Sequence, residues 1–206
     1  MFILLFCTWI KGLGQASAVA NLAQNLVYIG LANPFIVIAE QHPCESIVVT
    51  TDNGRLEKME HPCQYHYLPE KEGKGTITIQ TIKNGDTLRI GEHLFRVKSL
   101  PDPIPTVGGK STGFISRSVL KVQSGIPAIT YFGPCARFEV TGFTLIAQKA
   151  NGMHIILSAQ GALFTEALKQ QFYLLTPKDR VIFANIKATG PDGRIRLLTP
   201  IELTIE

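Results

Sequence analysis

The chain has 206 residues, enough for one large domain or two small ones. Hydrophobic residues make up 45% and charged residues 17%, a balance that supports a packed core and argues against intrinsic disorder. The net charge of +4 comes from scattered Lys and Arg without a basic block, so nucleic-acid binding is not expected.

The N-terminal segment has the features of a secretory signal peptide. An apolar run over residues 1–10 is too short to span a bilayer, which needs about twenty residues. It has the length of a signal-peptide core, and Ala16-Ser17-Ala18 provides an A-x-A cleavage pattern. No Lys or Arg precedes the run, and a buried N-terminal strand is the alternative. We expect residues 1–18 to be a signal peptide and the protein to be exported to the periplasm without a transmembrane anchor.

Beyond residue 30 the hydrophobic pattern has mostly period two. Such alternation is typical of strands with one buried and one solvated face, as in antiparallel sheets. The candidate strands are residues 34–39, 46–51, 63–68, 76–80, 93–99, 136–147, 153–159, 180–188 and 201–206. Turn signals separate them at residues 52–54, 84–86, 151–152 and 191–193. Short, regularly spaced strands with such turns favour β-sandwiches over a parallel α/β sheet.

One segment predicts a helix instead. Residues 163–175 place Phe164, Leu168, Phe172 and Leu175 at helical spacing, and Pro177 follows the segment. Since proline disfavours helical conformation in the residue before it, the helix should end near residue 175. We expect one amphipathic helix packed on the sheet of the C-terminal half.

A proline-rich stretch divides the chain. Residues 100–105 contain three prolines and predict a stiff, extended connector. We therefore predict a mainly β protein with two tandem antiparallel β-sandwich (Ig-like) domains, at residues 25–103 and 106–206, the second carrying the short helix.

The Cys and His residues form a repeated tripeptide, His42-Pro43-Cys44 and His61-Pro62-Cys63, with His66 nearby. In an oxidising compartment Cys44 and Cys63 are expected to pair as a disulfide, which would leave Cys135 unpaired. Two alternatives remain: unpaired buried thiols, or a zinc site formed by His42, Cys44, His61, Cys63 and His66, although the spacing differs from familiar zinc modules.

No motif indicates catalysis or a cofactor. Residues 107–112 resemble a phosphate loop, but position 104 is Ile104 where the Walker A pattern requires glycine. The sequence also lacks the G-x-S-x-G and H-E-x-x-H patterns, so we name no catalytic residue. Because a catalytic site can be assembled from dispersed residues, an enzyme such as a hydrolase stays a minor alternative.

Several blocks resemble the GldM/PorM family of gliding-motility and type IX secretion proteins. Residues 28–34 and 95–103 resemble the opening and the end of the third GldM periplasmic domain. The blocks that resemble the C-terminal domain are residues 113–116, 122–126, 138–143, 175–177, 181–188 and 190–196. The resemblance covers nearly everything after the leader, but the two His-Pro-Cys tripeptides are not part of it.

The resemblance implies a non-enzymatic structural or docking protein. It would bind another envelope protein, among them outer-membrane secretion or gliding components, and assembly of several copies is left open. The family's membrane anchor and helical periplasmic domain have no counterpart here, so coupling to a motor in the family's way is not expected. The alternative function is metal or ligand binding by the His-Pro-Cys residues. The residues of the interaction surface cannot be named from the sequence.

Overall fold

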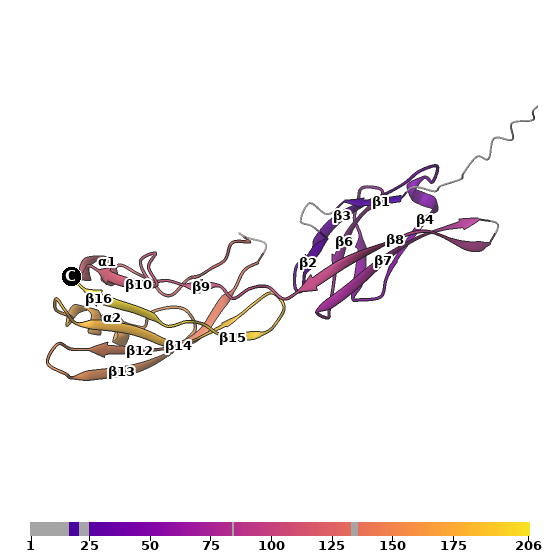
Figure 1. Cartoon of the computed structure of the whole chain (residues 1–206). Helices are drawn as coiled ribbons and strands as arrows, with labels where there is room; N and C mark the ends of the chain where they lie inside the picture. The colour runs from indigo at the N-terminus through magenta and orange to yellow at the C-terminus, as the bar shows by residue number, and fades with distance from the viewer. Residues whose placement is uncertain (1–16, 21–24, 84, 133–135) are drawn as a thin grey trace, which may run out of the picture. The chain divides into compact units, whose positions relative to one another are not determined.

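A computed structural model describes residues 17–20, 25–83, 85–132 and 136–206 (Figure 1). Its described residues form two compact units: the first holds those up to Tyr28 together with those in 32–98, and the second holds residues 29–31 and those in 99–206. The predicted signal peptide lies outside the described residues except for Ser17 and Ala18, which belong to the first strand. In the described ranges no helix is both long enough and apolar enough to cross a membrane.

The first unit is built from two four-stranded sheets. One has the strand order β1-β3-β6-β5 and the other β2-β8-β7-β4. The elements are β1 (Ser17–Ala20), β2 (Leu26–Tyr28), β3 (Asn33–Ala39), a 3-10 turn η1 (Cys44–Ser46), β4 (Ile47–Thr51), β5 (Arg55–Lys58), β6 (Gln64–Leu68), β7 (Gly73–Lys83) and β8 (Asp86–Lys98). The pairs are antiparallel except β2 with β8, which is parallel.

The core of the first unit lies between its two sheets. Tyr67 on β6 and Phe95 on β8 are almost fully buried, and their rings meet edge to face at 6.1 Å. Ile77 and Ile79 on β7 are completely buried, as the alternation of that strand predicts. The hydroxyl group of Tyr67 has no hydrogen-bond partner within the described part of the chain.

The turn at residues 52–54 is held by one side chain. Asn53 is buried, and its amide nitrogen donates to the carbonyl oxygens of Lys71 at 2.7 Å and Lys74 at 3.0 Å. Its amide oxygen accepts from the backbone N–H groups of Glu70 at 3.2 Å and Lys71 at 3.0 Å. Asn53 thus satisfies four backbone groups of the loop that leads into β7, where an uncapped loop would leave buried polar groups unpaired.

The second unit contains one main sheet with the order β10-β16-β14-β12-β13, to which β15 adds on β14. Its elements are β9 (Ile104–Pro105), β10 (Thr112–Ile115), α1 (Arg117–Lys121), β11 (Ala128–Ile129), β12 (Glu139–Gln148), β13 (His154–Gln160), α2 (Glu166–Tyr173), β14 (Arg180–Thr189), β15 (Ile195–Leu197) and β16 (Ile201–Ile205). β9 and β11 form a separate two-stranded ribbon, and β10 runs parallel to β16.

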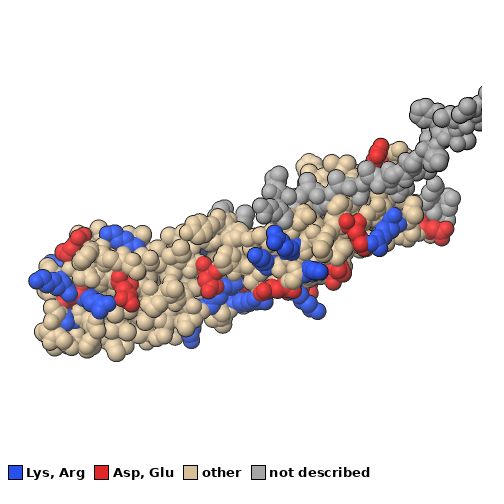
Figure 2. Space-filling view, in the orientation of Figure 1, with Lys and Arg blue, Asp and Glu red and all other residues tan. Residues whose placement is uncertain are grey.

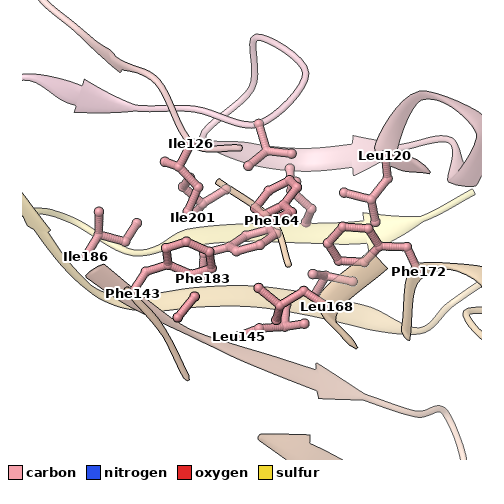
Figure 3. Packing of buried hydrophobic residues seen from close by; sticks show 14 of the residues in the cluster. Leu120, Ile126, Phe143, Leu145, Phe164, Leu168, Phe172, Phe183, Ile186 and Ile201 are labelled. Atoms are coloured by element: carbon pink, nitrogen blue, oxygen red, sulfur yellow. The ribbon is translucent and has the colours of Figure 1, made fainter. Parts of the chain in front are cut away.

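One face of the main sheet carries the core of the second unit. Phe143 on β12 and Phe183 on β14 contact Phe164, which precedes α2, at ring distances of 5.8 and 5.4 Å. Phe172 on α2 lies 5.2 Å from Phe164, and Figure 3 shows these rings pointing toward one another. Leu120 brings α1 into the same cluster. Burial of these side chains stabilises the unit by removing large apolar surfaces from water.

The helices differ from the predicted single helix. α2 is shorter than residues 163–175, because the hydroxyl group of Thr165 accepts the N–H of Leu168 and begins the helix there. A second helix, α1, is also present. It has five residues, too few to show a period, and begins where the hydroxyl group of Ser116 accepts the N–H of Val119.

The prediction of a mainly β protein is confirmed, with two differences in detail. The second unit covers its main sheet with helices and loops where a sandwich was expected. Two strand pairs are also parallel. The sequence did not predict them, because the strands that meet there are distant in the sequence and their pairing leaves no local pattern.

Candidate docking surface

Cys44 and Cys63 form a disulfide, with Cα atoms 5.3 Å apart. Cys44 begins η1, and Cys63 lies directly before β6, where its carbonyl oxygen accepts the N–H of Val37 on β3. The bond therefore ties the η1 segment to the β3–β6 pair and serves the stability of the first unit. Cys135, expected to remain unpaired, lies outside the described residues.

The zinc alternative receives no support. The disulfide uses both sulfur atoms, so neither cysteine can supply the thiolate that a zinc ion would require. His42 and His66 are half-buried and His61 is exposed. Among residues 17–20, 25–83, 85–132 and 136–206, no group of three or more His, Cys, Asp or Glu side chains has the arrangement of a metal site.

The second unit has a more informative feature, the uncovered face of its main sheet. Side chains alternate along each strand, so residues whose neighbours point into the core point away from it. We call this surface the open sheet face. Its members are Thr144, Ile146 and Gln148 on β12, His154, Ile156 and Ser158 on β13, Arg180, Ile182, Ala184 and Lys187 on β14, Ile195 and Leu197 on β15, and Glu202 on β16.

Three isoleucines lie side by side across the open sheet face. Ile146 on β12 pairs with Ile156 on β13 on one side and with Ile182 on β14 on the other. Ile156 on the outer strand is 64% exposed, whereas the other two are half-buried by their neighbours. Aliphatic side chains in direct cross-strand contact form a continuous apolar strip, and such strips on a surface mark interaction sites.

Few charges interrupt this strip. Arg180 and Glu202 lie at its margin and neutralise each other in an ion pair at 3.0 Å. Thr144, paired with both Ser158 and Ala184, flanks the strip on its other side. Figure 2 shows where Lys, Arg, Asp and Glu side chains lie on one side of the second unit.

β15 adds two apolar side chains to the open sheet face, beside the exposed Lys187 that pairs with Leu197, because its central residue is held inward. Arg196 donates two hydrogen bonds to Asp192, at 2.9 and 2.6 Å, and its Nε atom lies 3.0 Å from a carboxylate oxygen of Asp102. The hydrogen bonds from Arg196 lower the pKa of Asp192 despite its burial. With Arg196 fixed, alternation places Ile195 and Leu197 outward, and they are 72% and 67% exposed.

A buried carboxylate fixes the loop between β12 and β13. Asp179 is 1% exposed and accepts from the Lys149 ammonium group at 2.8 Å and from the backbone N–H of Ala150 at 2.9 Å. It also accepts from the N–H and the hydroxyl group of Thr176, and Lys149 donates to the Leu174 carbonyl oxygen. Burial alone would raise the pKa of Asp179, but these hydrogen bonds outweigh it and lower the pKa to about 2.

The open sheet face was missed in the sequence analysis, although a signal was present. Residues 155–157 are three consecutive apolar residues in a strand, so at least one must face away from the core. The alternation over residues 153–159 predicted a strand with one solvated face. The apolar run at residues 155–157 breaks that alternation. Such a departure identifies a candidate surface but not what covers it.

Comparison with known proteins identifies the second unit. The sequence profile of the GldM C-terminal domain matches residues 101–206, which include the whole main sheet and both helices. The chain belongs to the GldM C-terminal domain family. The GldM-like blocks recognised at residues 113–116 and 190–196 correspond to β10 and to the turn and strand that hold Arg196. No curated protein sequence matches the chain.

Two solved structures that match the chain resemble it only weakly. The Yersinia pseudotuberculosis adhesin InvE has 8% sequence identity and a TM-score of 0.32, with 94% of this chain and 59% of that chain covered. SGBP-B, from a Bacteroides ovatus mixed-linkage glucan utilization locus and solved with a mixed-linkage heptasaccharide, has 9% identity and a TM-score of 0.27, with 92% and 46% covered. This chain thus spans only about half the length of these proteins. Likenesses at this level identify no function for the GldM C-terminal domain seen here.

Proposed function

We propose that the chain is a non-enzymatic structural protein of the cell envelope, which docks another envelope protein through the open sheet face of its second unit. Membership in the GldM C-terminal domain family supports a role in gliding motility or type IX secretion. The leader-like segment at residues 1–18 supports export to the periplasm. The partner we favour is an outer-membrane secretion or gliding component.

The observation that carries this proposal is the set of exposed apolar side chains on the open sheet face. Ile156, Ile195 and Leu197 expose large aliphatic side chains on one face of one sheet, while the opposite face holds the core. Leaving such surface in water is unfavourable, at about 25 cal/mol per Å² of apolar area. A protein surface that covers the strip recovers this free energy, which gives docking its driving force.

The first unit has a supporting role in this proposal. We assign residues 25–103 to a domain that corresponds to the third GldM periplasmic domain, with Ig-like character in its two facing sheets, and residues 106–206 to the docking domain. The Cys44–Cys63 disulfide stabilises the first of these in an oxidising compartment.

Photo-crosslinking in living cells tests the proposal. A photoreactive amino acid at Ile156 or Leu197 should produce one defined adduct with another envelope protein. The matched control is Val122, which is 79% exposed but follows α1 and does not belong to the open sheet face. Adducts at the first two positions and none at Val122 are expected. Absence of adducts at Ile156 and Leu197, or equal adducts at all three positions, would refute docking through this face.

A further inference from the structure

The edge of the open sheet face is formed by β13, whose outer side has no strand partner among the described residues. β13 pairs only with β12 in the sheet order. The hydrogen bonds at the two ends, from Lys149 N to Met153 O and from Gly161 N to Thr141 O, fix the alternation of the ladder. The N–H and C=O groups of residues 154, 156, 158 and 160 therefore point away from β12.

This edge lacks the features that protect other edges of the molecule. β5 carries three charged residues among its four, Arg55, Glu57 and Lys58. At β10, Gly113 has a φ of 98° and the Lys110 ammonium group donates to the Phe114 carbonyl oxygen. β13 has seven residues without Lys, Arg, Asp, Glu, Pro or Gly. Natural sheets use charge, proline or distortion to block strand addition at their edges, and β13 uses none of them.

The chemistry on both faces of β13 specifies what would pair with it. On the open sheet face, Ile156 has Ile146 as its cross-strand neighbour. On the core face, Ile155 and Leu157 pack against the core but are only partly buried. The β12 partners of residues 154–160 include no charged side chain. On the core face a charged side chain beside Ile155 and Leu157 would lose water, and on neither face would it gain a counter-ion, so an incoming strand is expected to be uncharged, with apolar side chains on its core face.

We propose that β13 binds an extended, uncharged segment of the partner protein by strand addition, so that the partner continues the main sheet. This inference rests on the proposed function and specifies how docking occurs. Backbone hydrogen bonds to residues 154, 156, 158 and 160 supply the register, and contacts with Ile156 on one face and with Ile155 and Leu157 on the other supply selectivity.

The probe is a displayed library of peptides with seven random positions, the length of β13, selected on the full chain. Selected peptides should be uncharged and rich in Val, Ile, Thr and aromatic residues. Their binding should protect the amides of residues 154, 156, 158 and 160 from hydrogen exchange. Enrichment of charged peptides, or binding without protection of these amides, would overturn strand addition.

A backbone substitution separates strand addition from contact with the face alone. Ser158→Pro removes an outward N–H group that β12 does not use, and an edge strand tolerates proline there. It should weaken binding of the selected peptides roughly tenfold or more. The control Ser158→Ala keeps the N–H group while removing the hydroxyl contact with Thr144, and should bind as the original chain does. If Ser158→Pro does not fold, amide protection in the unmodified chain still decides the question.

The outcomes distinguish the two proposals. Photo-adducts at Ile156 without peptide binding or amide protection would leave the proposed function in place and refute strand addition. A chain that dimerises in sedimentation experiments, and becomes monomeric with Ser158→Pro, would show that β13 pairs with a second copy and would overturn the proposal of a separate partner.

Discussion

The charge of Asp179 should stabilise the second unit, and this stabilisation should be lost in strong acid. A substitution that removes the charge should abolish this pH dependence. The pKa of Asp179 is lowered from 3.8 to about 2. At 1.36 kcal/mol per pKa unit, this shift corresponds to about 2 kcal/mol of stabilisation of the folded state. Because the folded pKa lies below the unfolded one, the stabilisation is fully present above pH 4 and is lost as the pH falls through about 2.

The substitution Asp179→Asn removes the charge and places an NH₂ group among donors. We expect it to reduce the free energy of unfolding by about 2 kcal/mol or more at pH 7, and the difference from the original chain should shrink toward pH 2. Urea unfolding, followed by NMR signals of the Ile186 methyl groups in the core, measures this in the second unit.

A companion variant supplies the control. Lys149→Met removes the ammonium group that lies 2.8 Å from the Asp179 carboxylate, but leaves its backbone and hydroxyl donors in place. The pKa of Asp179 should rise, and the loss of stability in acid should begin at a higher pH. If Asp179→Asn lowers stability by the same amount at pH 7 and pH 2, the argument from the charge of Asp179 is wrong.

Three further predictions concern the first unit. Replacing Cys44 and Cys63 together by alanine should lower its free energy of unfolding by about 3 kcal/mol, because the bond closes a loop of 19 residues; unfolding that is unchanged by reductant in the original chain would contradict this. Asn53→Asp should lower the free energy of unfolding by about 2 kcal/mol, because it sets a carboxylate against two carbonyl oxygens. A melting temperature equal to that of the original chain would show that the four hydrogen bonds of Asn53 do not hold this loop. Tyr67→Phe should raise stability by about 1 kcal/mol by removing an unsatisfied buried hydroxyl, and a clear loss in thermal unfolding would show that this group has a partner.

The sequence predicts best those strands in which apolar and polar residues alternate over several positions. β3, β4, β6, β12, β13, β14 and β16 lie within a few residues of their predicted positions. β8 was predicted only from residue 93, because its first half is largely exposed and Gly91 interrupts the alternation. β9, β11 and β15 have two or three residues, too few for any period to appear.

Long-range partners account for the rest of what was missed. Cys44 and Cys63 could be paired from the sequence, because redox chemistry leaves few choices. Nothing near Arg196 in the sequence shows that it holds Asp102 as well as Asp192. The open sheet face was hidden for the same reason, since Ile146, Ile156 and Ile182 become neighbours only through the strand order.

The position of β16 between β10 and β14 has a consequence for how the second unit forms. β10 pairs with β16 at a separation of roughly 90 residues along the chain, and β16 in turn pairs with β14. While the chain emerges from the ribosome, β10 has no strand to pair with until β16 arrives. Closing so long a loop is slow, so the part of the core that β10 and β16 complete is exposed together with the edge of β13 during this interval. A chaperone that binds apolar strands would act most usefully in that window, before β16 completes the sheet.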